Sequence, residues 1–591
     1  MSLQHWLSLT SYKRFRAELL SEETLAFVAH LGSGAFQEIS GQKVNVTLTI
    51  SSRSTPDETT QTLLLDASSP ISPSLKEEAL GNSAILLTRQ TQHLKAPDHV
   101  VSFSTLNAKT RLSSAAWCLA GIMNGDTPRF VRNVWEVKPG KDWTYLQSTT
   151  DGNAFSGGYS TVIYYDSEHG HLRELREIRR DRLHNSDERG NQVWGKRGIA
   201  VDQMASLAVN TYNGNKYDSN VAVIVPYEEK NLPAIVAFCR SPEFAAEVRK
   251  IDKKLNVTNA TFGKVPFDLL RWGQIATEDS QGCLPEPYSD DPTQWLFHGH
   301  PAKASAGKAL HVALARLCGY RWPAETDKEI HLSPEARDWT FKVAALPEGD
   351  QDGLLAIESV AGEKPLADRL RAFLSEAFGT QWSDALERQL VAKSDETLDN
   401  KLAKDGSLEA WLRDRAFRQH CALFNQRPFL WHISDGLKNG FSVFVHYQRF
   451  TQANLRKLTY TMLGDWLRRA KDENNDLRYE KGRELQQKLE LVLEGEAPYD
   501  IFVRWKSLAE QPLGWDPDLN DGVRMNIRPF MEAGIMREQP KGIKWTKDRG
   551  NDVPSAPWYP VFKGERNNDY HTTLEEKRAA RAGNPKTVAA K

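Results

Sequence analysis

The sequence contains few of the features that stabilise secreted or membrane-embedded proteins. Its five cysteines, at positions 118, 239, 283, 318 and 421, form no C-x-x-C pair. Scattered cysteines in an odd number exclude a disulfide framework and a zinc ribbon, and they indicate a reducing compartment. No apolar run approaches the roughly 18 residues of a membrane helix, and no secretory leader is recognisable. We therefore expect a cytoplasmic protein that has no membrane partner.

The chain also lacks an excess of charge of either sign. It carries 76 Lys and Arg against 77 Asp and Glu, which gives a net charge of −1 at pH 7. A protein that binds DNA through bulk charge is basic, so nucleic-acid binding by this chain must depend on local patches. The length predicts roughly three or four domains, and the apolar content of 40% is sufficient for folded cores.

Residues 1–145 carry the pattern of a mixed α/β sheet. Residues 12–20 have helical spacing, and residues 25–31, 44–50 and 84–88 form apolar or alternating runs typical of strands. Gly32-Ser33-Gly34 follows the first of these strands and weakly suggests a nucleotide-binding loop. Because the G-x-G-x-x-G pattern is missing and no clear helix start follows, a turn between strands is the favoured interpretation.

Two arginines near a turn are the first candidates for DNA contact. Arg129 and Arg132 flank apolar residues directly after the turn at residues 125–128. Cations in such a position suit phosphate contact. The alternative is a pair of solvated arginines near Glu136.

A second set of candidates lies in a longer basic stretch. Residues 171–197 hold eight Lys or Arg against five acidic residues and end on Lys196 and Arg197, with glycines at positions 195 and 198. Glycines beside cations let the backbone approach a phosphate or a groove closely. For the stretch as a whole, a DNA-contacting patch and a solvated helix with internal ion pairs are equally compatible with the pattern.

A basic helix is predicted after Ser241-Pro242-Glu243, which supplies a capping residue, a proline in the first turn and an acid. The apolar residues that follow share one face, while Arg249, Lys250, Lys253 and Lys254 lie on the rest of the helix and just beyond it. Such a helix could lie across DNA or could be an ordinary surface helix. Residues 259–268, which include Lys264, have the pattern of a short strand.

The part of the chain after residue 330 is mainly helical in its pattern. Residues 367–378, 407–424 and 485–493 are amphipathic. Asp-Gly and Asn-Gly turns lead into a strand at residues 441–445, and an amphipathic helix follows at residues 455–467.

Two segments resemble metal-binding sites, and the C-terminal tail resembles a nucleic-acid-binding surface. His298-Gly299-His300 has no distant partner motif, so a structural role is favoured over a metal pair. Residues 516–522 resemble a calcium loop, but the glycine is misplaced and no glutamate closes the loop. Trp545 and Trp558 are interleaved with the basic residues Arg524, Arg528, Lys541, Lys544, Lys547 and Arg549; packing of the tail is favoured over base stacking.

Several of these passages together resemble one protein family. The strongest passages are residues 6–50, 125–135, 232–268, 285–301 and 427–550, which include Pro498-Tyr499-Asp500 and Trp515-Asp516-Pro517-Asp518-Leu519-Asn520-Asp521-Gly522-Val523-Arg524. They are similar to the C-terminal half of PglX-type DNA adenine-N6 methyltransferases. These enzymes belong to the BREX and DISARM phage-defence systems and are relatives of type IIG restriction-modification methylases.

The resemblance implies an α/β fold in four parts. Residues 1–145 are expected to form a partial class I methyltransferase sheet, the C-terminal remnant of a catalytic domain. An α+β target-recognition domain at 146–270, a linker and helical domain at 271–425, and an aromatic-rich, mainly helical domain at 426–591 follow. Double-stranded DNA is the implied partner. The DNA-binding candidates are Arg129, Arg132, Lys196, Arg197, Arg249, Lys250, Lys253, Lys254 and Lys264.

The family's chemistry needs residues that this sequence does not contain. An Asn/Asp-Pro-Pro-aromatic tetrapeptide holds the flipped adenine, and a glycine-rich loop holds S-adenosylmethionine. No Pro-Pro dipeptide occurs in the sequence. The resemblance thus implies S-adenosylmethionine as a cofactor whose binding motif is not in this chain, and we assign no catalytic and no metal-binding residue.

We therefore expect the chain to begin just after the catalytic motif and to be the recognition portion of such an enzyme, inactive alone. An N-terminal methyltransferase subunit, or a missing N-terminal half, would complete it, with other defence-system proteins as further partners. The alternative is a non-catalytic DNA-binding or assembly subunit derived from such an enzyme.

Overall fold

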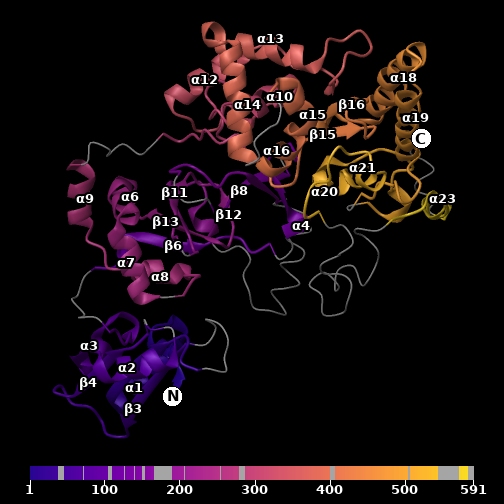
Figure 1. The fold of residues 1–591 in the computed structure, drawn as a ribbon. Helices are drawn as coiled ribbons and strands as arrows, with labels where there is room; N and C mark the ends of the chain where they lie inside the picture. Colours follow the sequence, from indigo (N-terminus) through magenta and orange to yellow (C-terminus); the bar gives the residue numbers. More distant parts are fainter. Residues whose placement is uncertain are drawn as a thin grey trace. The chain divides into compact units, whose positions relative to one another are not determined.

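The protein is a mixed α/β chain of several small sheets and many helices, and it divides into two compact units (Figure 1). The first unit comprises Met1–Ala115, Ser241–Lys254 and Thr261–Trp272, and the second comprises Ala116–Arg240, Leu255–Ala260 and Gly273–Lys591. The computed structural model describes residues 1–36, 45–68, 70, 72–103, 110–124, 127–138, 140, 142–149, 154–165, 190–204, 206–252, 254–278, 286–399, 406–503, 506–543 and 571–583.

The first unit is built on a five-stranded mixed sheet in the order β1-β3-β2-β4-β5. β2 and β4 are parallel, and the other neighbours are antiparallel. The predicted strands at residues 25–31, 44–50 and 84–88 are confirmed as β2, β3 and β5. The strands are β1 Ser2–Leu3, β2 Thr24–Gly32, β3 Val46–Ser52, β4 Gln61–Asp66 and β5 Ile85–Arg89.

Helices cover both faces of this sheet, as expected for an α/β arrangement. α1 (Lys13–Glu22) and α3 (Gln90–Lys95) contribute to a core around Leu25, Val28 and Leu64. α2 (Pro73–Asn82) packs on the opposite face, against the cluster that contains Leu31 and Leu65. The helix predicted at residues 12–20 is therefore confirmed as α1.

The basic helix forms as predicted, but the strand after it does not. α7 (Pro242–Ile251) is capped by the Ser241 hydroxyl, which accepts a hydrogen bond from the Phe244 N–H at 3.3 Å. The prediction of a strand at residues 259–268 is wrong, because Asn259–Lys264 forms the short helix α8. Phe262 of α8 stacks on Phe244 with ring centroids 5.8 Å apart, and this packing outweighs the alternating local pattern.

The second unit starts with two four-stranded sheets, in the orders β11-β10-β13-β6 and β12-β8-β9-β7. The first sheet is antiparallel throughout, and in the second the two-residue edge strand β12 runs parallel to β8. The strands are β6 Ala116–Ala120, β7 Val131–Asn133, β8 Trp143–Gln147, β9 Thr161–Tyr164, β10 Gly198–Asp202, β11 Val209–Tyr212, β12 Lys216–Tyr217 and β13 Val221–Pro226.

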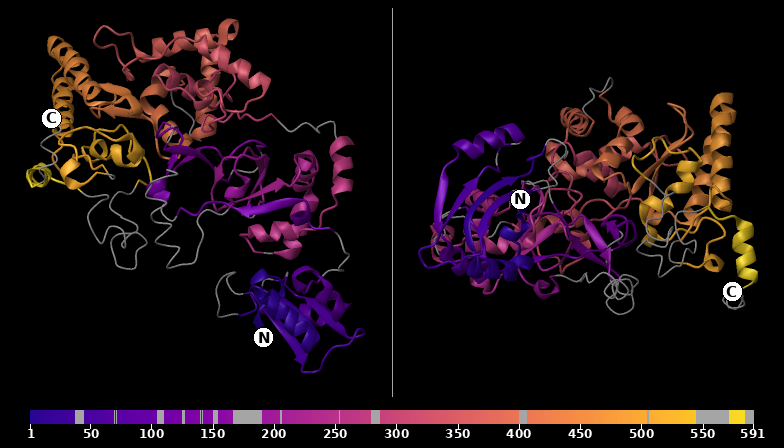
Figure 2. Two further views of the ribbon diagram at one scale, coloured as in Figure 1. Left: turned by 180° about the vertical axis from the view of Figure 1, so that it is seen from behind. Right: turned by 90° about the horizontal axis from the view of Figure 1, so that it is seen from below.

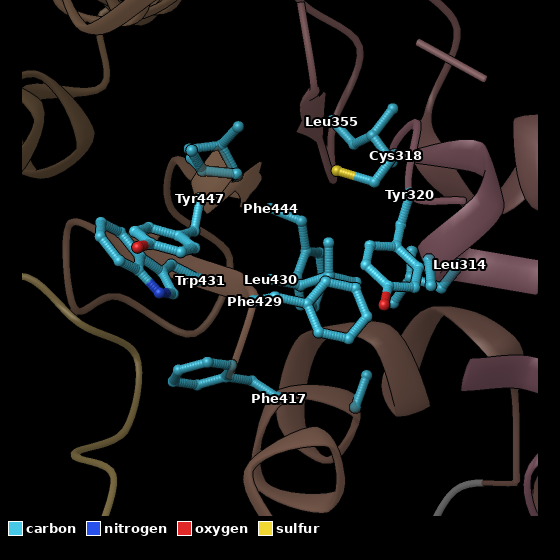
Figure 3. Packing of buried hydrophobic residues seen from close by; sticks show 14 of the residues in the cluster. Leu314, Cys318, Tyr320, Leu355, Phe417, Phe429, Leu430, Trp431, Phe444 and Tyr447 are labelled. Atoms are coloured by element: carbon cyan, nitrogen blue, oxygen red, sulfur yellow. The ribbon is translucent and has the colours of Figure 1, made fainter. Parts of the chain in front are cut away.

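A third sheet, in the order β14-β16-β15, carries the main aromatic core of the second unit. Phe429 stacks on Tyr320 with centroids 4.2 Å apart, and Trp431 stacks on Tyr447 at 5.2 Å (Figure 3). The hairpin turn is closed by the Asp435 carboxylate, which accepts N–H bonds from Leu437 and Phe441 at 3.0 and 2.7 Å. The strands are β14 Leu354–Ala356, β15 Leu430–Ser434 and β16 Ser442–His446.

Helices surround this third sheet. The predicted helix at residues 367–378 is confirmed, whereas residues 407–424 form two helices that meet at Arg415. Arg415 forms an ion pair with the buried Asp395 at 2.9 Å, which holds the chain at this break. The helices of this region are α10 Ala309–Leu317, α11 Pro323–Thr326, α12 Pro334–Ala344, α13 Leu366–Phe378, α14 Asp384–Leu398, α15 Leu408–Asp414 and α16 Ala416–Leu423, and α4 Thr127–Phe130, α6 Leu232–Arg240 and α9 Leu269–Glu278 lie earlier in the chain.

The predicted helix at residues 455–467 is part of a longer helical run that a π turn interrupts. α17 (Gln452–Arg456) continues through a π-helical turn at Lys457–Met462 into α18 (Leu463–Asp472). α18 packs beside α19 (Asp476–Glu494), as both views in Figure 2 show. Gln486 of α19 donates to the Thr459 carbonyl at 3.0 Å, so the neighbouring helix satisfies a carbonyl of the π turn.

The C-terminal segments pack around a buried carboxylate. Asp500 is fully buried and accepts bonds from Arg528 at 3.3 Å and from the Thr572 N–H at 2.9 Å. His571 lies 2.7 Å from its other oxygen. The helices here are α20 Gly522–Asn526, α21 Arg528–Glu532 and α23 Leu574–Ala582. Pro498-Tyr499-Asp500 therefore supplies a packing centre.

The two compact units do not coincide with the four parts expected from the sequence, whose boundaries fall after residues 145, 270 and 425. The first unit ends its N-terminal part at Ala115, and β6, which lies before residue 145, pairs with β13 of the second unit. One apolar core then runs from Val134 to Met536 and joins segments on both sides of residues 270 and 425. Within the described ranges, no helix is both long enough and apolar enough for a bilayer.

Candidate nucleic-acid interface

The structure places the first pair of candidate arginines inside the second unit. Arg129 is 2% exposed and Arg132 is 5% exposed. Arg132 donates to the carbonyls of Pro128 at 2.8 Å and Asn520 at 3.2 Å. Guanidinium groups with so little surface have no room for a phosphate, so the expected surface position is not found. Arg132 instead joins β7 to the turn at Leu519–Asp521.

Lys196 and Arg197 are exposed, as expected. The Lys196 ammonium lies 4.2 Å from the centroid of the Trp117 ring. Gly195, with φ +77°, donates its N–H to the Gly214 carbonyl at 2.9 Å. A Cβ on Gly214 would lie 2.7 Å from the Gly195 Cα, so the close approach of these two loops requires glycine.

A second lysine lies over aromatic rings in the adjoining loop. The Lys216 ammonium is 4.4 Å from the Tyr165 centroid and 4.8 Å from the Trp194 centroid. Sequence reasoning missed this residue because its partners are distant along the chain. We refer to Trp117, Trp194, Lys196, Arg197 and Lys216 as the lysine–aromatic surface. Lys196 and Lys216 are positioned by cation–π contacts.

A cavity of about 400 Å³ adjoins this surface. Its walls combine aromatic rings, a cation and a carboxylate. Tyr145 stacks on Trp295 at 4.5 Å, and burial, aided by the Asp327 carboxylate, raises the pKa of Tyr145. The lining residues are Gly140, Trp143, Thr144, Tyr145, Trp194, Gly214, Asn215, Lys216 and Asp327.

Three polar atoms of the cavity residues have unused hydrogen-bonding capacity within the described part of the chain. The Thr144 Oγ1 and the Trp194 Nε1 are buried and make no hydrogen bond there. Asp327 accepts the Glu329 N–H at 2.9 Å through Oδ1. Its Oδ2 has no partner among the described residues. Because the Thr144 and Trp194 atoms have almost no accessible surface, they are not open to the cavity.

The cations of the basic helix belong to the first unit. Arg249 donates to the Lys254 carbonyl, and Lys250 pairs with Glu247 at 2.5 Å. Lys264 donates to the Ser8 carbonyl at 2.6 Å, and burial lowers its pKa. Lys253 lies outside the described residues, as do the basic residues between 171 and 189 and those between 544 and 549.

The glycine pair after β2 does not fit S-adenosylmethionine. Gly32 and Gly34 have positive φ angles of 66° and 74°, as a turn requires. The ammonium of Lys76, which is 2% exposed, donates to the carbonyls of Leu31 at 2.5 Å and Ser68 at 3.3 Å. The space at these strand ends is therefore filled by the chain's own cation, and no step of a methyl transfer can be assigned to this loop.

The two histidines of His298-Gly299-His300 stabilise a turn. His298 accepts the His300 N–H at 3.2 Å, and His300 accepts the Ala302 N–H at 3.2 Å. Both rings pack against Trp339, at 5.7 and 4.9 Å. Burial lowers the pKa of His298 to about 3 and that of His300 to about 4. The Nδ1 atoms of both histidines thus accept hydrogen bonds from backbone N–H groups.

The segment that imitates a calcium loop is held by protein contacts. Asp518 accepts the Asn520 N–H at 2.9 Å, and Glu136 accepts the Val523 N–H at 2.9 Å. Over the residues that the structure describes, no group of three or more His, Cys, Asp or Glu is arranged to hold a metal ion.

Comparison with known proteins gives similarity only at the level of solved structures. No family model and no curated protein matches the chain. The type IIG restriction endonuclease BpuSI is similar with a TM-score of 0.20 and 10% identity, over 47% of this chain and 40% of that chain. The type IIL restriction-modification enzyme MmeI, solved in complex with DNA, is similar with a TM-score of 0.23 and 10% identity, over 62% and 45%.

The chain thus spans less than half the length of either neighbour. TM-scores at this level carry no information about chemistry.

Proposed function

We propose that this chain is the DNA-recognition portion of a site-specific DNA adenine-N6 methyltransferase of a restriction-modification or phage-defence system, and that it does not transfer methyl groups alone. The observation that carries the proposal is the lysine–aromatic surface. It lies within residues 116–227, close to the segment that the family resemblance assigns to target recognition.

The surface has the chemistry of a phosphate-contacting patch. Lys196 and Arg197 are exposed, and Lys196 is held over Trp117. Exposed cations contact phosphates irrespective of sequence, and such contacts set register on the duplex. The close approach of Gly195 and Gly214 keeps the loop slim enough to reach the backbone of a nucleic acid.

Methyl transfer would depend on residues outside this chain. The family motif for adenine is absent from the sequence, and Lys76 fills the strand ends near Gly32. We propose that an N-terminal methyltransferase subunit or half supplies S-adenosylmethionine binding and catalysis. Other proteins of a BREX or DISARM defence system are the further partners that we propose.

A second candidate function is a non-catalytic DNA-binding or assembly subunit derived from such an enzyme. The lysine–aromatic surface and the missing adenine motif are equally compatible with it. Both functions use the lysine–aromatic surface, and they differ only in whether methyl transfer follows. A methylation assay with labelled cofactor separates them: the chain is assayed alone and with a candidate N-terminal partner. Activity from the chain alone contradicts both functions.

DNA binding itself is tested by charge removal at the exposed loop. We expect Lys196→Gln with Arg197→Gln to lower duplex affinity about tenfold and to reduce the slope of log K against log salt by about 1 to 2. Fluorescence anisotropy at several salt concentrations measures both quantities. Arg14→Gln is the matched control, because Arg14 is a 92% exposed side chain of the first unit. Equal affinity of the double variant and the control excludes this surface.

A further inference from the structure

Two arginines lie together at the turn after α10. Arg449 ends the 3-10 helix that follows β16, and its guanidinium rests on Gly319: a Cβ added to that glycine would lie 2.6 Å from the Arg449 Nη1. The same Nη1 donates to the carbonyls of Asp350 at 2.8 Å and Gln351 at 3.1 Å. Arg321, two residues after Gly319, donates from Nη1 to two backbone carbonyls, at 2.9 and 3.3 Å. Carbonyl groups thus fix one end of each guanidinium without neutralising its charge.

Both arginines keep hydrogen-bond donors at the surface. The Nε and Nη2 atoms of Arg321 and Arg449 make no hydrogen bond within the described part of the chain. None of these atoms is fully enclosed, and both side chains are half-buried. Neither arginine forms an ion pair with a described residue. Each guanidinium is therefore held in place on one side and open to a ligand on the other.

A third cation, the exposed Lys138, follows β7 in the same region. Gln448 donates to the Trp135 carbonyl at 2.6 Å, which holds the segment of Lys138 beside the end of β16. The charges of all three cations act on one buried ring. Burial lowers the pKa of His446 to about 3, and the charges of the two arginines and of Lys138 lower it further. We refer to these residues as the three-cation cluster: Lys138, Arg321 and Arg449.

Most acidic groups around the cluster already have a cation of their own. Glu325 pairs with Arg316 at 2.6 Å, and Asp350 pairs with Arg369 at 2.9 Å. Glu348 is exposed and lies within charge range of the cluster. One exposed carboxylate beside three cations leaves the cluster with a net positive charge. Since the planar fork of a guanidinium matches the oxygens of a phosphate, the ligand that fits best is a phosphate group.

Two segments lead from the cluster toward the lysine–aromatic surface. Gly140, two residues after Lys138, lines the cavity that Lys216 also lines. Asp327, six residues after Arg321, lines the same cavity. The cluster and the lysine–aromatic surface therefore belong to adjoining parts of the second unit. A free anion needs only one of these places, whereas a nucleic-acid backbone presents phosphates at regular intervals and can contact both.

We propose that the three-cation cluster is a second contact for the phosphate backbone of DNA, separate from the one at Lys196 and Arg197. This inference rests on the proposed DNA-binding function and extends its footprint to the turn after α10 and the end of β16. Phosphate contacts of this kind fix the register of the protein on the duplex and carry no sequence information. The cluster should therefore add to the salt dependence of binding for any duplex sequence.

The test removes two charges from the cluster in the full chain. Lys138→Gln with Arg321→Gln should lower duplex affinity about five- to tenfold and reduce the slope of log K against log salt by about 1 to 2. Fluorescence anisotropy at several salt concentrations measures both quantities. Arg388→Gln is the matched control, because Arg388 is an exposed arginine of α14 that forms no ion pair with any described residue. The control should change neither quantity.

Two further variants separate the guanidinium fork from its charge and from the fold. Arg449→Lys keeps the charge but loses the fork, so affinity should fall about threefold while the salt slope stays the same. Lys138→Gln alone changes only an exposed side chain, and it decides the matter if an arginine variant fails to fold. It should lower affinity about two- to threefold and the slope by about 1.

The outcomes for the cluster and for DNA binding as a whole are distinguishable. Affinity and salt slope that are unchanged in both Lys138 variants, together with a loss in the Lys196 and Arg197 double variant, overturn this inference and leave the proposed function standing. Calorimetric titration with inorganic phosphate adds a second arm: phosphate binding that the cluster variant loses, with no change in duplex affinity, assigns the cluster to a free anion and also overturns it. Failure of the unaltered chain to bind duplex removes both.

Discussion

The two units use their lysines in different ways. In the first unit the Lys76 ammonium is buried and donates to three backbone carbonyls, and Lys264 donates to the Ser8 carbonyl. In the second unit the exposed Lys196 lies over the Trp117 ring. A carbonyl-bound ammonium stabilises its own fold, whereas one that lies on a ring keeps its charge available to a ligand.

The difference shows why counting cations does not locate a binding surface. The candidate residues of both units are equally basic in sequence. The buried and the exposed cations differ in the groups that surround them in the folded protein. Burial of a charge is costly unless hydrogen bonds compensate it, so a cation near unsatisfied carbonyls is drawn inward. A cation near exposed rings has no such requirement.

The largest effect of a single substitution should come from removing the interior ammonium. Lys76→Met leaves the carbonyls of Leu31, Ala67 and Ser68 without their donor, and we expect the first unit to lose about 3 kcal/mol of stability. Hydrogen exchange of β2 and β4 measures this loss. The exposed Glu77→Gln is the neighbouring control, with an expected change below about 0.5 kcal/mol. Equal protection in both variants would show that the buried contacts contribute nothing.

Acid should destabilise the second unit through three buried histidines. Burial lowers the pKa of His432 and His446 to about 3 and that of His311 to about 4, below the usual value of 6.5. The unfolded chain then binds more protons between pH 6.5 and about 3, so the stability is complete above pH 6.5 and is lost as pH falls. Each group contributes up to about 1.4 kcal/mol per pH unit.

Thermal unfolding between pH 7 and pH 5 measures this dependence. His432→Phe should flatten it, because the ring packs against Phe444 at 4.3 Å and both its nitrogens lack hydrogen-bond partners among the described residues. His5→Gln, in the first unit, serves as the comparison. A pH profile that is unchanged in His432→Phe contradicts the assignment.

Substitution of Gly214, in the turn beneath the lysine–aromatic surface, should have the next largest effect on stability. Gly214→Ala places a methyl group 2.7 Å from Gly195 at a φ of +89°, and we expect a loss of about 1–3 kcal/mol together with weaker DNA binding. Gly273→Ala is the control, since nothing lies within 4 Å of its Cβ position. It should leave DNA binding intact and stabilise α9 slightly. Similar melting temperatures for both variants would contradict the close approach.

The smallest effect is expected at the basic helix. Lys253→Ala with Lys254→Ala should weaken duplex affinity about twofold and flatten its salt dependence slightly, whereas the Lys196 and Arg197 double variant should lose about tenfold. Anisotropy titrations at low salt compare the two. An unchanged affinity removes the helix from the interface, and a larger loss than at Lys196 reverses the comparison between the units.

Much of the secondary structure was predictable from local pattern. The Ser241 cap and the hairpin around Asp435 form where their signals predict. Errors arose where distant contacts outweighed local preference, as for Phe262 on Phe244 and for the break at Arg415. Glycines, caps and turn residues act over a few positions, and the sequence displays such effects directly.

The candidate site was predictable only in part. Gly195 and Gly198 drew attention to Lys196 and Arg197, and the structure places both cations at exposed positions. Lys216 and Asp327 carried no comparable signal, because their partners come from segments that are far away in the chain. Arg129 and Arg132 looked equally accessible and are buried.

The sequence by itself determined the charge balance, the scattered cysteines, the missing Pro-Pro motif and the caps and turns that begin and end many elements. Only the tertiary structure decided which cations face solvent and which rings lie beneath them. The physical reason is that hydrogen bonds and ring contacts between distant segments set the burial of each side chain, and residue spacing alone contains no record of those distances.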